Sequence, residues 1–324
     1  MNYKKLLYIL LLLPMLFIYN GCSKDDDSTA PPTVNEAEEL AKYLEQQNMP
    51  AGIASMMTAT DVRTGQLTGA NQIVLDIRSA TDFADKGHIE GAVNVEFKDL
   101  LTYYKANNLQ SKTKVIIACY SGQTAGYAVG LLRLLGYSNV TDLKWGMTSW
   151  NSACDSWSSK TANSRATQFV TTATPKNAAG SLPTLSTGKS TPQEILEARV
   201  QELLNIGFSN DTKVSVDAVF QNLNNYYMMN YWPVDHYNTG HIPGAVQYEA
   251  ADLKFSTNLK TLPADKPVVV YCYTGQTSAH LIAYLRVMGY DGRTLLYGCN
   301  AMIYDSMPGA KFVSTEINDF PLVH

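Results

Sequence analysis

Short apolar runs alternate with stretches of helical periodicity along most of this chain of 324 residues. Residues 73–75, 115–118 and 268–271 are apolar runs typical of buried parallel strands. In segments 124–135 and 277–288, apolar residues recur at helical spacing, and a Gly-Tyr pair directly follows each segment. Strands that alternate with helices predict an α/β fold with parallel sheets.

The chain repeats itself at a shift of 153 residues, the separation of Cys119 and Cys272. A GHIEGAV motif at 87–93 returns as GHIPGAV at 240–246. The CYSGQT motif that begins at Cys119 returns as CYTGQT at Cys272. Because both motifs keep their spacing, we expect two homologous domains in tandem.

The first domain is expected at 35–157 and the second at 193–324. Residues 158–192 between them are rich in Ser, Thr, Ala, Lys and Gly, as linkers are. Within this linker, residues 168–172 are a candidate for an extended strand that docks on a domain. The TPQE sequence that begins at Thr191 is typical of a capped helix start.

The amino terminus has the features of a targeting segment. Residues 1–21 combine two lysines with a 14-residue apolar run, which suits a secretory signal and is shorter than the ~20 residues of a membrane span. Gly21-Cys22 resembles the lipobox of bacterial lipoproteins, which implies that Cys22 is acylated. Residues 22–34 then form an acidic tether, and we expect a lipid anchor in the outer membrane, at the cell surface or on the periplasmic side.

Composition excludes several classes of protein. A hydrophobic fraction of 45% is too high for a disordered chain, and five cysteines are too few for a disulfide scaffold. With 25 basic against 29 acidic residues, nothing indicates a nucleic-acid partner. The five histidines lack ligand spacing and no Cys-x-x-Cys occurs, so we expect no metal site and no cofactor.

Cys119 and Cys272 are the candidate nucleophiles. Each ends a predicted buried strand and stands before a glycine-containing loop and a helix. We expect backbone N–H groups and the positive end of the helix dipole to point at each sulfur. Such a site lowers a thiol pKa and stabilises an anion. The carboxyl end of a parallel strand is also where open α/β sheets bind ligands.

The motifs around these cysteines resemble a rhodanese domain. The resemblance covers the Asp76-Ile-Arg78 sequence, GHIEGA, the CYSGQT loop and GMTSW at 146–150, and the second copy matches from about 195 to 310. The chain is therefore similar to a tandem rhodanese sulfurtransferase, with two domains that each hold a parallel sheet flanked by helices.

This resemblance implies a persulfide mechanism. A cysteine takes sulfane sulfur from a small anionic donor, of the thiosulfate or 3-mercaptopyruvate class, and passes it to a thiophilic acceptor such as a thioredoxin-like protein. The nucleophiles would be Cys119 and Cys272. The anion-binding loops would be Tyr120, Ser121, Gly122, Gln123 and Thr124, and Tyr273, Thr274, Gly275, Gln276 and Thr277.

The sequence departs from the family pattern in its charges. Neither loop carries Arg or Lys to pair with a sulfonate, as many thiosulfate-using loops of the family do. The loops resemble more closely those of mercaptopyruvate-type enzymes, or of an enzyme fed by a partner's persulfide. Asp76 and Arg78 are expected to form a supporting ion pair, whereas the second copy has Asn230 and Trp232 instead. This loss favours Cys119 as the stronger nucleophile.

Other interpretations remain open at this point. A cysteine phosphatase is disfavoured, because it needs Arg at the sixth position after the cysteine, where this chain has Ala125 and Ser278. A surface-anchored sulfur carrier or binding module without turnover is the main alternative to an enzyme. A structural lipoprotein with vestigial sites is a third.

Two histidines and two cysteines outside the loops could also be reactive. The resemblance to the rhodanese family implies that His88 and His241 stabilise the turns in which they lie, rather than form Cys–His dyads. Cys154 and Cys299 are expected to be half-buried, inert thiols, as against a disulfide or resolving thiols for a persulfide.

Overall fold

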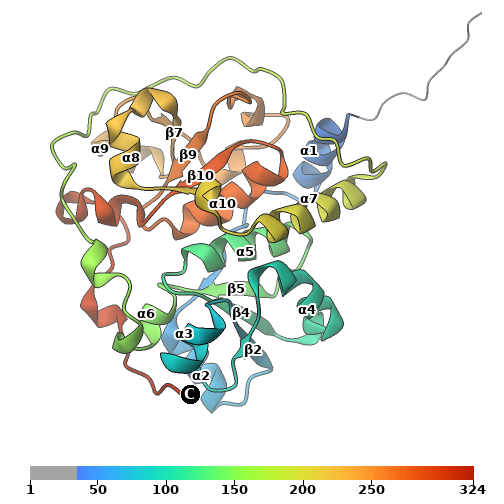
Figure 1. The fold of residues 1–324 in the computed structure, drawn as a ribbon. Coiled ribbons are helices and arrows are strands. Elements are labelled where there is room, and N and C mark those ends of the chain that lie inside the picture. The colour runs from blue at the N-terminus through green and yellow to red at the C-terminus, as the bar shows by residue number, and fades with distance from the viewer. Residues whose placement is uncertain (1–34) are drawn as a thin grey trace, which may run out of the picture. The chain divides into compact units, whose positions relative to one another are not determined.

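The computed structural model describes residues 35–324, so the expected signal peptide and the whole acidic tether, which begins with the acylation site Cys22, lie outside the described part. Residues 35–324 contain two five-stranded sheets, and every strand pair in them is parallel (Figure 1). Helices flank both sheets. The predicted α/β fold with two tandem copies is confirmed.

The two sheets have the same topology. In spatial order, the first consists of β1 (Met56–Met57), β5 (Val140–Leu143), β4 (Lys114–Ala118), β2 (Gln72–Asp76) and β3 (Val93–Asn94). The second consists of β6 (Lys213–Val214), β10 (Gly292–Leu295), β9 (Val268–Tyr271), β7 (Tyr227–Asn230) and β8 (Val246–Gln247). Asp76 pairs with Ala118 and Asn230 pairs with Tyr271, so Asn230 takes the place of Asp76 as predicted.

The helices follow the expected alternation with the strands. In the first copy they are α1 (Glu36–Gln46), α2 (Ala59–Leu67), α3 (Ala80–Asp85), α4 (Leu100–Ala106), α5 (Gln123–Leu134) and α6 (Met147–Trp150). In the second they are α7 (Pro192–Ile206), α8 (Val216–Gln221), α9 (Val234–Thr239) and α10 (Gln276–Val287). The Thr191 side chain accepts a hydrogen bond from Glu194 N and caps α7, as its sequence predicts. Among residues 35–324, no helix has both the length and the apolar character needed to cross a membrane.

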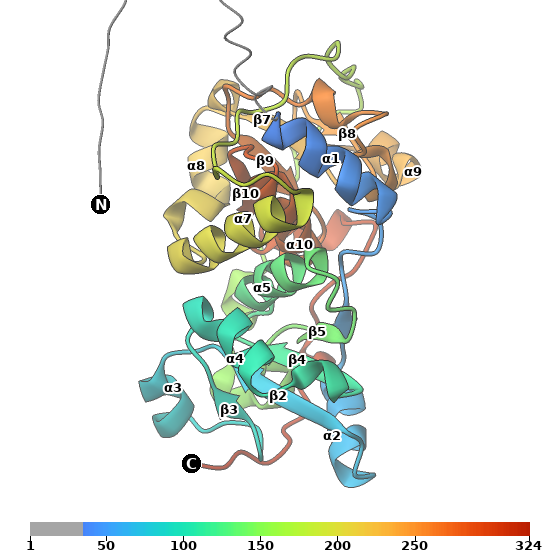
Figure 2. The same ribbon diagram turned by 90° about the vertical axis from the view of Figure 1, so that its right-hand side faces the viewer.

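The two copies pack through α5 and α10, which lie side by side in both views (Figures 1 and 2). Small residues permit the close approach, since a Cβ added at Gly130 would stand only 2.7 Å from that of Ala283. One buried apolar cluster includes residues of both helices, among them Leu131 and Leu285. The two copies therefore share a hydrophobic core.

Each copy also sends its C-terminal segment onto the other copy. Val170, in the linker, forms an antiparallel bridge with His241, and Val323 forms the same bridge with His88. The bridging residues are 153 positions apart in both cases, so the repeat extends to these exchanged segments. The segment 168–172 thus docks through Val170, as predicted.

Candidate functional site

The two cysteine loops have the backbone geometry that their sequences predict. Cys119 follows β4 and Cys272 follows β9, and α5 and α10 begin four residues later. Gly122 and Gly275 make the turn into these helices with φ of 84° and 75°, a left-handed conformation that glycine adopts without a steric cost.

Backbone N–H groups point at both sulfurs. Gly122 N and Ala125 N lie 3.2 and 3.3 Å from Cys119 Sγ. Gly275 N and Ser278 N lie 3.1 and 3.3 Å from Cys272 Sγ. Two fixed donors at the head of a helix can stabilise an anionic sulfur, as the loop sequences predict.

Burial opposes this effect at the first loop. Only 1% of Cys119 and 2% of Cys272 is exposed. Burial raises the pKa of the Cys119 thiol to about 11, because the thiolate loses its hydration and the loop N–H groups offset only part of that loss. The nearby Asp142 carboxylate raises this pKa further. The loop N–H groups thus lower the pKa of Cys119 as predicted, but burial outweighs them and the net pKa is raised.

The loop glutamines bind the opposite copy. Gln123 Oε1 accepts a 2.8 Å hydrogen bond from Tyr297 N, and Gln276 Oε1 accepts one of the same length from Trp145 N. Both glutamine side chains are buried. These two side chains, expected in the anion-binding loops, are thus engaged in contacts between the copies. The Gln in both loops was visible in the sequence, but nothing there indicated that the loops face each other.

The loop tyrosines are held by residues that follow the neighbouring strand. The Tyr120 hydroxyl bonds to Asp82 and lies 3.3 Å from Ser79 N. Tyr273 bonds to His236 and stacks on Trp232.

The hydroxyl side chains of the loops differ in their contacts. Ser121 Oγ accepts from Gln123 Nε2 at 3.0 Å, and Thr274 Oγ1 accepts from Gln276 N at 3.2 Å. Thr274 Oγ1 also lies 3.9 Å from Cys272 Sγ. Thr124 and Thr277 are half-buried on the first turns of α5 and α10.

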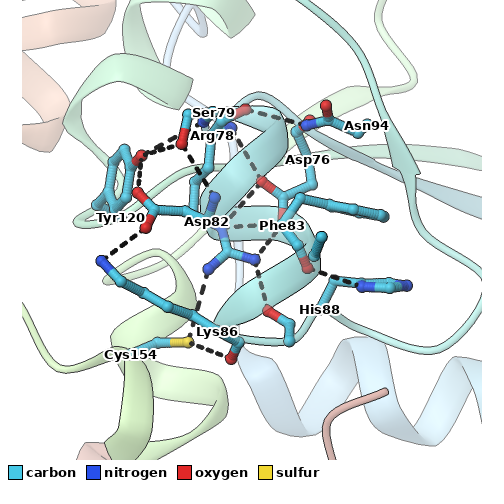
Figure 3. Close-up of polar contacts among 12 residues, drawn as sticks. Asp76, Arg78, Ser79, Asp82, Phe83, Lys86, His88, Asn94, Tyr120 and Cys154 are labelled. Atoms are coloured by element: carbon cyan, nitrogen blue, oxygen red, sulfur yellow. Dashed lines mark hydrogen bonds and ion pairs between the residues drawn. The ribbon is translucent and has the colours of Figure 1, made fainter. Parts of the chain in front are cut away.

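Asp76 and Arg78 form the predicted ion pair, with 2.7 Å between Arg78 Nη2 and Asp76 Oδ2 and both side chains 1% exposed. Figure 3 shows the guanidinium of Arg78 between the Asp76 carboxylate and the sulfur of Cys154. Arg78 also donates to Gly87 O at 2.8 Å. The pair therefore braces the turn before β3, and neither side chain forms a hydrogen bond with Cys119 in the described structure.

The two turn histidines, His88 and His241, and the two cysteines outside the loops, Cys154 and Cys299, have structural contacts. His88 stacks on Phe83 and His241 on Tyr237, with ring centroids 3.7 Å apart in both pairs, which agrees with a stabilising role in the turns. Cys154 and Cys299 are free thiols in the structure. Both are buried rather than half-buried, because Cys154 packs beside Arg78 and Cys299 lies in the core of the second copy.

A buried histidine–aspartate contact between the copies was not foreseen from the sequence. His280 Nε2 on α10 lies 2.8 Å from Asp142 Oδ1 on β5, and both side chains are fully buried. Burial raises the pKa of Asp142, and His280 opposes the rise. Asp142 pairs with Ile117 as Thr294 pairs with Val270, so these residues occupy the same position in the two sheets. One residue is lost between Cys272 and Gly298, and this offset hides the equivalence in a comparison at a fixed shift.

The sequence of residues 58–153 and 231–302 matches the profile of the rhodanese-like domain. The chain belongs to the rhodanese-like family. Its family relatives include thiosulfate sulfurtransferase GlpE of Pseudomonas fluorescens (strain SBW25), which is 35% identical over 78 residues that make up 24% of this chain and 69% of that protein. GlpE of Pseudomonas putida (strain GB-1) is 33% identical over 78 residues, 24% of this chain and 68% of the relative.

Among solved structures, the rhodanese-like chain is similar to the crystal structure of thiosulfate sulfurtransferase from Pseudomonas aeruginosa. The two are 14% identical, with a TM-score of 0.30, over 90% of this chain and 49% of that one. The family assignment rests on the sequence matches, which place this chain among proteins that include sulfurtransferases.

Proposed function

We propose that this rhodanese-like protein is a sulfurtransferase that carries sulfane sulfur as a cysteine persulfide at its two loops, on Cys119 and Cys272. The observation that carries the proposal is the duplicated pair of backbone N–H groups, 3.1 to 3.3 Å from each sulfur at the head of a helix. Such donors favour a negatively charged sulfur over a neutral one.

The reaction needs no external oxidant or reductant. A cysteine thiolate attacks the outer sulfur of thiosulfate, a new S–S bond forms, and sulfite leaves with the electron pair of the old bond. The charge then rests on the terminal sulfur of Cys–S–S⁻, close to the loop N–H groups. From 3-mercaptopyruvate, the leaving group is the enolate of pyruvate. A thiolate acceptor, such as that of a thioredoxin-like protein, attacks the terminal sulfur and restores the cysteine thiolate.

The charges of the loops support one donor class over the other. Their side chains are Tyr, Ser or Thr, Gln and Thr, with no cation to pair with the sulfonate of thiosulfate. We therefore propose that 3-mercaptopyruvate is the better donor of the two.

Sulfur transfer from each donor to cyanide tests the proposal, in the wild type, Cys119→Ser, Cys272→Ser and the double variant. We expect activity in the wild type, none in the double variant, and a mass increase of about 32 Da, one sulfur, on the reacting cysteine. The absence of both turnover and adduct with either donor would overturn the proposal.

A sulfur carrier that docks a persulfide without turnover is the second candidate. The observation that favours it is the burial of both sulfurs, which hinders exchange with donors in solution. A carrier would take up one sulfur per reactive cysteine in a single-turnover experiment and show no steady-state transfer to cyanide.

We also propose that Cys22 anchors the protein in the outer membrane, on the basis of its lipobox-like sequence. Metabolic labelling with palmitate, followed by membrane fractionation, tests this. Label and membrane association are expected in the wild type and not in Cys22→Ala, and an unlabelled wild type would contradict the anchor.

A further inference from the structure

The two cysteine loops differ at their sixth position after the cysteine. Ser278 occupies this position after Cys272, and its Oγ lies 3.4 Å from Cys272 Sγ. Ala125 occupies it after Cys119 and offers only its backbone N–H. The Ser278 side chain is completely buried, so its hydroxyl must find its partners within the protein.

Thr294 provides the second partner. Ser278 Oγ lies 2.7 Å from Thr294 Oγ1, and Thr294 Oγ1 lies 3.2 Å from Gly275 O. Thr294 is also completely buried, on β10 beside the loop. The contacts form a chain that runs from the sulfur of Cys272 through two hydroxyl groups to a carbonyl of the same loop.

This chain can serve both protonation states of the sulfur. With a neutral thiol, S–H donates to Ser278 Oγ, Ser278 donates to Thr294 Oγ1, and Thr294 donates to Gly275 O. With a thiolate, both hydroxyl groups rotate, so that Ser278 donates to the sulfur and Thr294 donates to Ser278. Only the thiol proton leaves, to water, and the hydroxyl groups keep theirs. A hydrogen bond to an ionised acceptor is stronger than one to a neutral acceptor, so the chain favours the thiolate.

The first loop has the opposite electrostatics. The strand position of Thr294 is occupied by Asp142, whose carboxylate disfavours a second negative charge on Cys119. Asp142 is engaged by His280 from the other copy. A hydroxyl chain therefore faces one sulfur, whereas a carboxylate lies near the other.

We propose that Ser278, positioned by Thr294, donates a hydrogen bond to the Cys272 thiolate and makes the second loop the working site of the chain. The inference rests on the proposed persulfide chemistry and specifies where it occurs. Ser278 touches the reacting sulfur and is a catalytic residue, whereas Thr294 acts through Ser278 and is a positioning residue.

The test compares the wild type with Ser278→Ala, Thr294→Val and Thr294→Ser. Two readouts are followed for each cysteine by peptide mass spectrometry: the pH profile of alkylation by iodoacetamide, and single-turnover uptake of sulfur from 3-mercaptopyruvate. Cys119 in the same molecule is the internal control. Ala125 fills the equivalent position in the first loop, so this site accommodates the Ser278→Ala side chain, and a thermal melt checks the fold.

In Ser278→Ala, we expect the alkylation profile of Cys272 to move upward by about one pH unit, which is about tenfold less thiolate at a fixed pH below the midpoint. Sulfur uptake at Cys272 should fall by about the same factor. Thr294→Val should cause a smaller shift and Thr294→Ser should restore the wild-type profile, with Cys119 unchanged throughout.

Two outcomes would overturn the inference. In one, the Cys272 profile stays in place in Ser278→Ala, and in the other both cysteines shift together, as a loosened fold would cause. Failure of the proposed function is a separate result, because sulfur uptake would then be missing in every variant while the alkylation profiles still report on Ser278.

Discussion

At the scale of single residues, the same loop backbone surrounds two cysteines whose neighbours differ in charge. Each sulfur accepts two backbone hydrogen bonds, but Asp142 lies near Cys119 and Ser278 lies against Cys272. In a buried site such differences are large, because little water is present to screen them. The chemistry of each cysteine therefore depends on side chains that lie outside the recognisable motif or at its edge.

The first prediction concerns the reactivity of Cys119. Because its pKa is raised to about 11, the rate of its alkylation in the folded protein should rise about tenfold per pH unit up to that value. Stopped alkylation with peptide-level mass spectrometry measures the rate, and the denatured protein is the control. A rate that reaches a plateau below pH 9 would contradict the raised pKa of Cys119.

The raised pKa also links the stability of the fold to pH. Because the folded protein holds the thiol proton more tightly than the unfolded chain, the stabilising effect of the protonated thiol is lost as the pH rises from 9.0 towards 11.

The second prediction concerns the ion pair that braces the turn before β3. Arg78→Met should cost about 3–5 kcal/mol of unfolding free energy, because it leaves the buried Asp76 carboxylate unpaired. Asp76→Asn combined with Arg78→Met should recover most of that loss, since Asn230 at this place accepts from Trp232 N as Asp76 accepts from Arg78 N. Urea denaturation measures both, and a double variant as unstable as the single one would count against this explanation.

At the scale of elements, the two loop–helix units face each other across the contact of α5 and α10. A Cβ at Gly122 would collide with the side chain of Gln276, and one at Gly275 would collide with Gln123. The same glutamines accept hydrogen bonds from the backbone of the opposite copy. Each loop therefore has two functions, to hold a sulfur and to join the copies.

The third prediction separates these effects with two glycines of similar backbone conformation. Gly91 has φ 75°, and a Cβ added there would meet no atom within 4 Å. Gly91→Ala should therefore lower the unfolding free energy by about 1 kcal/mol, for the left-handed backbone alone. Gly122→Ala, at φ 84°, should cost about 1–3 kcal/mol more, since displacing Gln276 leaves Trp145 N buried without its acceptor. If urea denaturation gave equal losses of unfolding free energy for the two variants, the contact between Gln276 and Trp145 N would contribute nothing to stability.

At the scale of the described molecule, residues 35–324, the two copies stabilise each other by exchanging their C-terminal segments. The segment near the C-terminus docks on the first copy, where Trp150 Nε1 donates to Pro321 O and the Trp150 ring packs edge-on against Phe320 at 5.1 Å. The linker docks on the second copy at His241. With a shared core in addition, neither copy has a complete set of contacts by itself.

The fourth prediction follows from this exchange. Phe320→Ala removes a half-buried ring and should lower the unfolding free energy by about 1–3 kcal/mol. Although Phe320 belongs to the second copy, the loss should appear in hydrogen exchange of β2 and β4 in the first. Leu67→Ala, at a side chain that is 72% exposed, is the control and should change little. Loss of protection confined to the second copy would refute the coupling.

The repeat, the α/β class and the two cysteine loops could be predicted from the sequence. The repeat shows as one pattern present twice, and the class and the loops are local properties, because strand patterning, a left-handed glycine and a helix start depend on residues close together in the chain. The Asp76–Arg78 pair is local in the same sense, whereas for residues 168–172 only an extended docking segment was predicted and not its partner His241 in the second copy.

The surroundings of each sulfur became clear only from the folded chain. Asp142 lies near Cys119, Thr294 reaches Cys272 through Ser278, and His280 crosses from one copy to the other. These contacts join residues that are far apart in the sequence, and the loss of one residue before Gly298 hides their equivalence. The pKa of a thiol depends on burial and on charges in space, so two loops of nearly the same sequence can place their cysteines in different electrostatic surroundings.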